Sequence, residues 1–86
     1  MAVYFVAVVT NPSAVLAKAK ELYPDAVFRL TDDKFFVNTD QTSLDLSNKI
    51  GVRDGTIGTG IVLRVTTYNG RVTSTLWEWL GARMEK

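Results

Sequence analysis

The sequence predicts an α+β domain with the element order βαββαβ and a further C-terminal helix. Segments rich in β-branched and aromatic residues alternate with segments that have helical spacing, and turn-forming residues separate them. Hydrophobic residues make up 47% and charged residues 22% of the chain, as in globular proteins. A length of 86 residues suits one hydrophobic core, so we expect residues 1–86 to form a single domain.

The first expected element is a strand at residues 2–9, which Thr10, Asn11 and Pro12 end. One parity of this strand contains Val3, Phe5, Ala7 and Val9, and the other contains Ala2, Tyr4, Val6 and Val8. Both parities are apolar, whereas a strand with one solvated face alternates apolar with polar residues. We therefore expect both faces of the sheet to be covered, one of them by the C-terminal helix or by a second subunit.

A first helix is predicted over residues 12–22. Asn11 can cap it, Pro12 suits its first position, and Pro24 ends it. The apolar stripe of this helix consists of Val15, Leu16, Ala19, Leu22 and Tyr23. The spacing predicts that this stripe packs on the sheet.

Two short β-prone segments, residues 26–30 and 35–39, flank a polar linker of hairpin length and predict an antiparallel pair. A second helix should follow, with Asp40 or Thr42 as its N-cap and Gly51 as a left-handed residue at its C-terminal end. The residues at helical spacing are Leu44, Leu46, Ser47 and Ile50.

A glycine-rich loop at residues 54–60 leads into a fourth expected strand at 61–68. The dipeptide Asn69-Gly70 favours a type I′ turn, so residues 71–73 could return as a short fifth strand.

A final helix is expected after this turn. Thr75 and Glu78 have the spacing of a capping box, and Leu76, Leu80 and Met84 follow at helical spacing. The complete order is that of a ferredoxin-like fold with an added helix. Right-handed connections would place the first two helices on one face of a four-stranded antiparallel sheet.

The composition excludes several kinds of chemistry. The chain has no cysteine and no histidine, so it lacks disulfides, the Ser-His-Asp and Cys-His nucleophile systems and the usual zinc ligands. We predict no enzymatic activity and assign no catalytic residue, metal site or cofactor. No apolar run is long enough to span a bilayer, so we expect a cytoplasmic protein without membrane contact.

Two motifs have both a functional and a structural interpretation. Asp32 and Asp33 offer carboxylates to a hard cation such as Mg²⁺, but adjacent aspartates are more often turn formers. The segment 55–60 is similar to a phosphate-binding loop, but it leads into a strand instead of a helix. A plain connection is the favoured interpretation, and anion binding stays open.

The strands also carry residues that suggest nucleic-acid binding. RNA-recognition sheets stack bases on strand aromatics, and this chain has Tyr4 and Phe5 on the first strand and Phe35 and Phe36 on the third. Arg29 and Arg64 could share a sheet face with one such set. The sequence patterns of RNA-recognition motifs are absent, and aromatic residues on strands usually pack in the core. The nucleic-acid alternative therefore depends on Arg29, Arg64 and Phe36.

Trp77 and Trp79 are two positions apart in the last expected helix and point about 200° apart. One helix face cannot bury both indoles, so they either form a partner surface or are wrapped by loop and strand residues. The residues predicted to bind a protein partner are Trp77, Trp79, Tyr4, Val6 and Val8.

Three stretches carry a family resemblance: the N-terminal residues 1–6, the hairpin end at 34–40, and residues 77–80. Together they resemble the small SinR-like bacterial proteins, which are similar in fold to the CRISPR adaptation nuclease family. The resemblance implies a ferredoxin-like fold and a homodimer. The nuclease relatives place a metal-binding aspartate after the first strand, where this chain has Thr10 and Asn11, so the resemblance does not extend to metal-dependent cleavage.

The sequence therefore predicts a non-enzymatic interaction or regulatory domain that acts through protein–protein contacts as a homodimer. Two alternatives stay open: a nucleic-acid-binding protein that uses its sheet face, and a phage-type inhibitor of a host enzyme. The sequence does not identify the partner.

Overall fold

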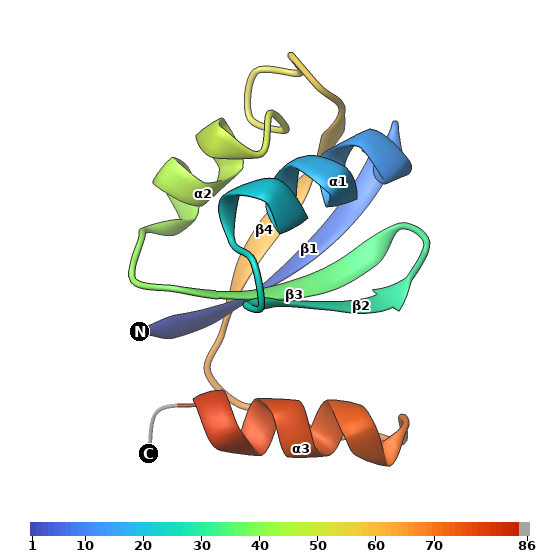
Figure 1. Ribbon diagram of the computed structural model, residues 1–86, viewed down its shortest axis with the longest axis vertical. Helices are drawn as coiled ribbons and strands as arrows, with labels where there is room; N and C mark the ends of the chain where they lie inside the picture. The colour runs from blue at the N-terminus through green and yellow to red at the C-terminus, as the bar shows by residue number, and fades with distance from the viewer. Residues whose placement is uncertain (85–86) are drawn as a thin grey trace.

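Four antiparallel strands form one sheet in the order β2-β3-β1-β4, and three helices pack on it (Figure 1). The computed structural model describes residues 1–84. Along the chain the elements are β1 (Ala2–Thr10), α1 (Pro12–Leu22), β2 (Val27–Thr31), β3 (Lys34–Thr39), α2 (Ser43–Lys49), β4 (Thr59–Val65) and α3 (Ser74–Arg83). The predicted α+β class, the four-stranded antiparallel sheet and the C-terminal helix are thus confirmed.

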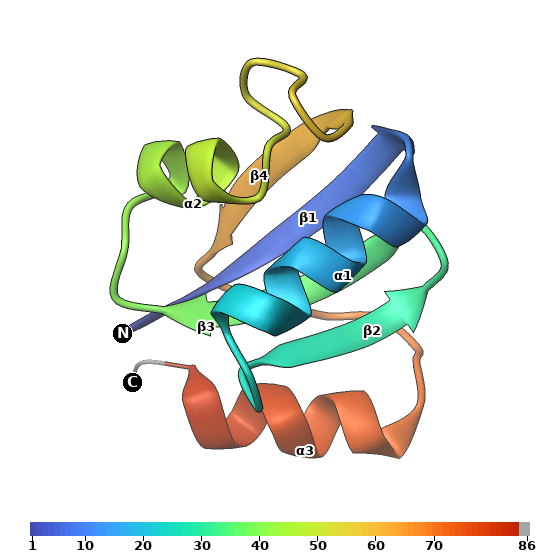
Figure 2. The same cartoon turned by 45° about the horizontal axis from the view of Figure 1, so that its top comes forward.

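The helices cover the two faces of the sheet unequally. α1 and α2 lie on one face and α3 lies on the other, as Figures 1 and 2 show. Tyr4 is opposite both Val37 and Arg64, and Phe5 is opposite both Phe36 and Leu63. Even-numbered residues of β1 therefore face α1 and α2, and odd-numbered residues face the side of α3.

The larger part of the core lies beneath α1 and α2. Its buried residues are Ala2, Tyr4, Val6, Val8, Val15, Ala19, Phe35, Val37, Leu46, Ile50 and Val52. The apolar stripe predicted for α1 supplies Val15 and Ala19, whereas Leu22 at its end is partly exposed. Burial of these side chains is the main stabilising contribution on this face.

The caps of the first two helices differ from each other. Thr42 is the N-cap of α2, and its Oγ1 accepts a hydrogen bond from Asp45 N at 3.1 Å. Gly51 follows α2 with φ +77°, as the sequence predicts. Asn11 stands at the N-cap of α1 with φ 58°, but its side chain does not cap the helix; its Nδ2 donates to Ile57 O at 3.0 Å instead.

α3 covers part of the second face of the sheet. Because β1 is apolar on both faces, a cover by the C-terminal helix or by a second subunit was expected, and the helix provides it. Val3 and Phe36 from the sheet and Leu76 and Leu80 from α3 form a second buried cluster. The rings packed around it are Phe5, Phe28, Trp77 and Trp79. The side chain of Asn38 also lies here, and its buried Oδ1 accepts no hydrogen bond.

The predicted fifth strand is wrong. β4 ends at Val65, and residues 66–73, which we call the linker, contain no strand. A type I′ turn needs positive φ at both central residues, and of Asn69 and Gly70 only Gly70 has it. The linker instead crosses to the other face of the sheet and positions α3 (Figure 1).

The predicted capping box is also wrong. The N-cap of α3 is Thr73, without a side-chain capping bond, and Thr75 lies inside the first turn. In the part of the chain that the structure describes, no helix has the length and apolar character needed to cross a membrane.

Candidate protein interaction site

The structure places the five residues predicted to bind a partner in two regions. Tyr4, Val6 and Val8 are buried beneath α1 and α2, and the Tyr4 hydroxyl donates to Gln41 O at 2.7 Å. These three side chains are core residues and do not form a surface for a partner. Trp77 and Trp79 lie on α3 and are both half-buried.

The two indoles of α3 contact different neighbours. Trp79 packs on Phe28 and Phe36, with ring centroids 5.8 and 6.3 Å away, and the Arg83 guanidinium lies 4.6 Å from its ring centroid. Trp77 stacks on Tyr68 of the linker. Strand, helix and linker residues therefore wrap both indoles, which is the second of the two arrangements that the sequence left open.

The residues proposed for nucleic-acid binding do not come together. Arg29 lies on β2 and is paired with Asp32, and Arg64 lies on β4 at the opposite edge of the sheet. Both belong to the parity that faces α1 and α2, whereas Phe36 is buried on the other face beneath α3. These three side chains therefore do not share one face of the sheet.

The turn aspartates are engaged by their neighbours. Asp32 pairs with Arg29, and Asp33 accepts from Thr31 Oγ1 at 2.8 Å and from Lys34 Nζ at 2.9 Å. The hydrogen bonds from Lys34 and Thr31 lower the pKa of Asp33. Among residues 1–84 no group of three or more acidic side chains is arranged to hold a metal ion.

The glycine-rich segment is a packed connection. The N–H groups of Ile57 and Gly58 both donate to Gly51 O, at 3.0 and 3.2 Å, and are therefore not directed at an anion. Hydrogen bonds from Thr56 hold the nearby Asp54 carboxylate and lower its pKa. A Cβ atom on Gly58 would overlap Thr10 O, so glycine allows the loop to approach the end of β1.

The outer edge of β4 is a feature that the sequence analysis missed. β4 pairs with β1, and no strand among residues 1–84 lies on its other side. Val8 N donates to Asp33 O, so the even residues of β1 direct their peptide groups towards β3 and the odd ones towards β4. Ile61 and Leu63 pair with odd residues of β1, and consequently Gly60 and Val62 direct their peptide groups to the outer edge.

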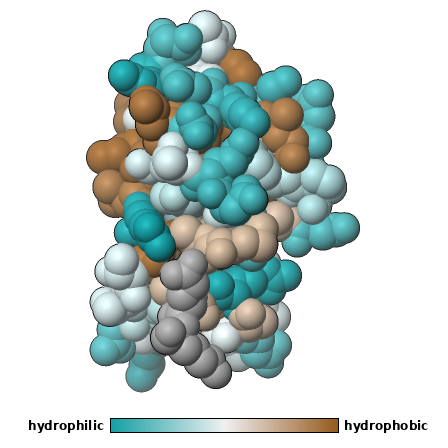
Figure 3. All heavy atoms as spheres, turned by 90° about the vertical axis from the view of Figure 1, so that its left-hand side faces the viewer, coloured by the Kyte–Doolittle hydropathy of each residue, from teal (hydrophilic) through white to brown (hydrophobic). Residues whose placement is uncertain are grey.

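Aliphatic side chains lie exposed beside this edge. Ile61 is 53% and Leu63 48% exposed on the face that α3 covers only in part. α3 packs against β1 and β2 and leaves these two positions uncovered. Figure 3 shows hydrophobic side chains gathered above the level of α3 on the side of the molecule that carries α2.

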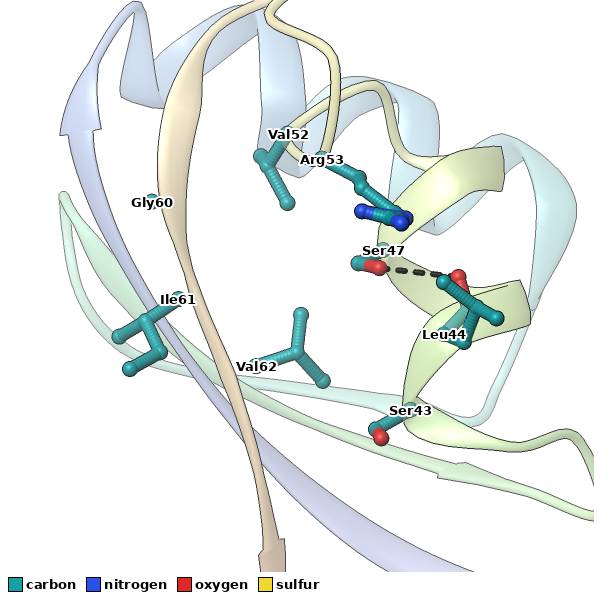
Figure 4. Close-up of a pocket in the computed structure, with 8 residues that line it drawn as sticks. All are labelled: Ser43, Leu44, Ser47, Val52, Arg53, Gly60, Ile61 and Val62. Atoms are coloured by element: carbon teal, nitrogen blue, oxygen red, sulfur yellow. Dashed lines mark hydrogen bonds between the residues drawn. The ribbon is translucent and has the colours of Figure 1, made fainter.

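A groove of about 340 Å³ lies on the other face, between α2 and β4. Its lining residues are Ser43, Leu44, Ser47, Val52, Arg53, Gly60, Ile61 and Val62. In Figure 4, Val62 points into the groove, Ile61 points to the opposite side of β4, and the Arg53 guanidinium reaches towards α2. Ser47 Oγ donates to Leu44 O at 2.9 Å, and the Leu44 side chain is 50% exposed.

We call the outer edge of β4, with Gly60, Ile61, Val62, Leu63 and the neighbouring Leu44, the edge surface. The opposite edge of the sheet, β2, differs from it in charge. Arg29 on β2 and the turn after it form ion pairs, and charged side chains discourage strand pairing at an edge. The edge surface itself has no charged residue, although Arg53 and Arg64 flank it.

A sequence signal for this surface exists: a nearly uncharged apolar strand, residues 59–65, at a position that the predicted topology places at an edge. Comparisons of the chain with protein-family models and with curated protein sequences find no match.

Proposed function

We propose that this protein is a non-enzymatic interaction domain that binds a protein partner by adding an extended strand of that partner to the outer edge of β4. The observation that carries the proposal is the open edge itself. Gly60 and Val62 direct their peptide groups outward between two exposed aliphatic residues on one face and a groove on the other.

Strand addition explains why these features occur together. Backbone hydrogen bonds to the edge supply affinity, and alternate side chains of the added strand supply specificity. One set of the partner's side chains enters the groove beside Val62 and Arg53, and the other set packs on Ile61 and Leu63. An apolar strand with alternating small and large residues suits both sides.

The overall architecture supports a ferredoxin-like fold with an additional C-terminal helix. The element order is βαββαβα and the sheet order is β2-β3-β1-β4, which is the arrangement expected of that fold. The likeness to the SinR-like proteins is part of this proposal.

The two alternative functions differ in how well they agree with the edge surface and the buried sheet. Nucleic-acid binding through the sheet face loses its support, because both faces carry helices and Phe36 is buried. Inhibition of a host enzyme is compatible with the edge surface, since an enzyme can also supply an extended segment. Inhibition of a host enzyme would therefore specify who the partner is, while the partner would still bind by strand addition.

Displayed random peptides of about ten residues, selected against dilute protein, test the proposal. Apolar extended peptides should bind, and amide NMR shifts should map to residues 59–65. Val62→Pro should abolish binding because it removes the outward N–H, and proline is tolerated on an edge strand. Val62→Ala keeps the N–H and is the matched control; equal binding by both variants, or shifts confined to α3, would contradict strand addition.

A further inference from the structure

We infer that the strand added to β4 is β4 of a second copy of this chain, so that two four-stranded sheets join into one continuous sheet. This inference rests on the proposed function and names its partner.

The sequence of β4 is self-complementary about Val62. A two-fold axis at Val62 places the outward peptide groups of Val62 opposite those of Val62 in the second copy, where they exchange two hydrogen bonds. Ile61 then lies opposite Leu63 of the second copy, and Leu63 opposite Ile61. These apolar cross-strand pairs join the exposed aliphatic side chains of the two molecules into one patch.

The registers that place the axis at one of the two other outward-directed residues are less favourable. An axis at Arg64 places the two Arg64 side chains directly opposite each other, and like charges in that position destabilise a sheet. An axis at Gly60 leaves Leu63 outside the paired segment. With the axis at Val62, Arg64 lies opposite Gly60 of the second copy, which has no side chain to clash with it.

Both sides of the sheet have room for this arrangement. On one face, a groove separates β4 from α2, and the exposed Leu44 lies at its rim. On the other face, α3 packs against β1 and β2, away from the outer edge of β4 (Figure 1). On this face α3 therefore leaves the outer edge of β4 uncovered.

The contact has suitable dimensions. Seven residues at about 3.4 Å each give a paired line of roughly 24 Å. The molecule itself measures 33 × 23 × 20 Å, so the line runs along a large part of it. The net charge of +1 gives little long-range repulsion between copies. At the other edge of the sheet, the charged pair of Arg29 on β2 with Asp32 discourages strand pairing.

Sedimentation velocity from low-micromolar to near-millimolar protein is the first test. The unaltered chain should change from monomer to dimer across this range, and Leu63→Glu should remain a folded monomer. Val72→Glu introduces the same charge at an exposed apolar position of the linker and should leave the dimer intact. Circular dichroism establishes that each variant is folded.

A charge pair tests the register. Ile61→Glu alone and Leu63→Lys alone should each prevent self-association, because each places two charges in the apolar patch. In a mixture of these two variants, the introduced carboxylate lies opposite the introduced ammonium group only if the axis passes through Val62. The mixture should therefore form a one-to-one heterodimer.

The outcomes separate the inference from the proposed function. If the chain stays monomeric at every concentration but binds peptides at residues 59–65, the partner is not a second copy of the chain. Strand addition to β4 is then retained. If those peptides are acidic and salt weakens their binding, a partner that pairs with Arg53 takes the place of the second copy. A dimer that tolerates Leu63→Glu, or a mixture that stays monomeric, overturns the interface or its register.

Discussion

Tyr68 of the linker stacks on Trp77 of α3, with ring centroids 5.2 Å apart and ring planes inclined by 25°. On the other flank of the helix, Trp79 contacts Phe28 and Phe36 of the sheet. Ring contacts on both flanks thus hold α3 over the second face. Substitutions at these contacts therefore test how firmly α3 packs on the sheet.

Tyr68→Ala should weaken the docking of α3. Loss of the aromatic pair is expected to lower the free energy of unfolding by about 0.5–1.5 kcal/mol. Tryptophan emission should shift to longer wavelength as Trp77 becomes more exposed. Urea denaturation followed by fluorescence measures both effects, and Tyr68→Phe, which keeps the ring, should behave like the unaltered chain.

Leu80→Ala tests the cluster beneath α3. Leu80 is 1% exposed, so its truncation should cost about 2–5 kcal/mol of unfolding free energy. Leu22→Ala makes the same change at the end of α1, where the side chain is 38% exposed, and should cost less than about 1 kcal/mol. Similar losses for both variants would show that α3 is not packed as described.

Gly58→Ala and Gly81→Ala should change stability in opposite directions. A Cβ atom at Gly58 meets the backbone oxygen of Thr10, which cannot move without disturbing β1. A Cβ atom at Gly81 meets nothing within 4 Å, and alanine in a helix interior is about 0.5–1 kcal/mol better than glycine. Thermal unfolding should therefore show a lower midpoint for the first variant and a higher one for the second.

Thr42→Ala removes the side chain that caps α2 and should cost about 1 kcal/mol in chemical denaturation. Thr75→Ala is the control, because Thr75 is exposed and lies inside α3 without a capping role. Its effect should stay within about 0.5 kcal/mol. An equal or larger loss for Thr75→Ala would show that the contact between the Thr75 and Thr73 hydroxyls, 3.0 Å apart, stabilises the start of α3 as much as Thr42 stabilises α2.

Tyr23 should make stability depend on pH in the alkaline range. Burial, followed by the charges of Asp45 and Asp40, raises the pKa of Tyr23 above its ordinary value of 10.0. A raised pKa in the folded state means that its contribution is full below pH 10.0 and is lost as pH rises through the folded pKa. Unfolding free energies measured across this range should therefore decline.

Tyr23→Phe separates this effect from the other titrating groups. The variant loses the hydrogen bond that the Tyr23 hydroxyl donates to Gln41, at a cost of about 0.5–1.5 kcal/mol near neutral pH. It also lacks the ionisable phenol, so the gap between the two proteins should narrow above pH 10.0. A constant gap would show that Tyr23 does not titrate with a raised pKa.

The sequence was sufficient to predict most of the secondary structure. Apolar runs marked β1 and β4, proline and glycine marked the ends of α1 and α2, and the two apolar parities of β1 indicated a covered second face. These signals are local, or depend only on which side chains must leave water. The fifth strand failed because the path of the linker to α3 overrides the turn preference of Asn69-Gly70.

The candidate site was not predictable in the same way. Periodicity shows that both parities of β1 are apolar, but it does not show that Tyr4, Val6 and Val8 face α1 and α2. The exposure of Ile61 and Leu63 depends on where α3 lies across the sheet, and that position is set by contacts between distant segments. Sequence patterns describe each element and not its lateral placement.

The central position of β1 has a consequence for synthesis on the ribosome. β1 is synthesised before β4, which is one of the two strands that pair with it, and Val3 lies opposite Val65. Its second face is covered by α3, which follows β4 in the chain. The nascent chain thus holds an apolar strand that stays incompletely paired until β4 and α3 have been synthesised, an interval in which such segments are prone to aggregate or to bind chaperones.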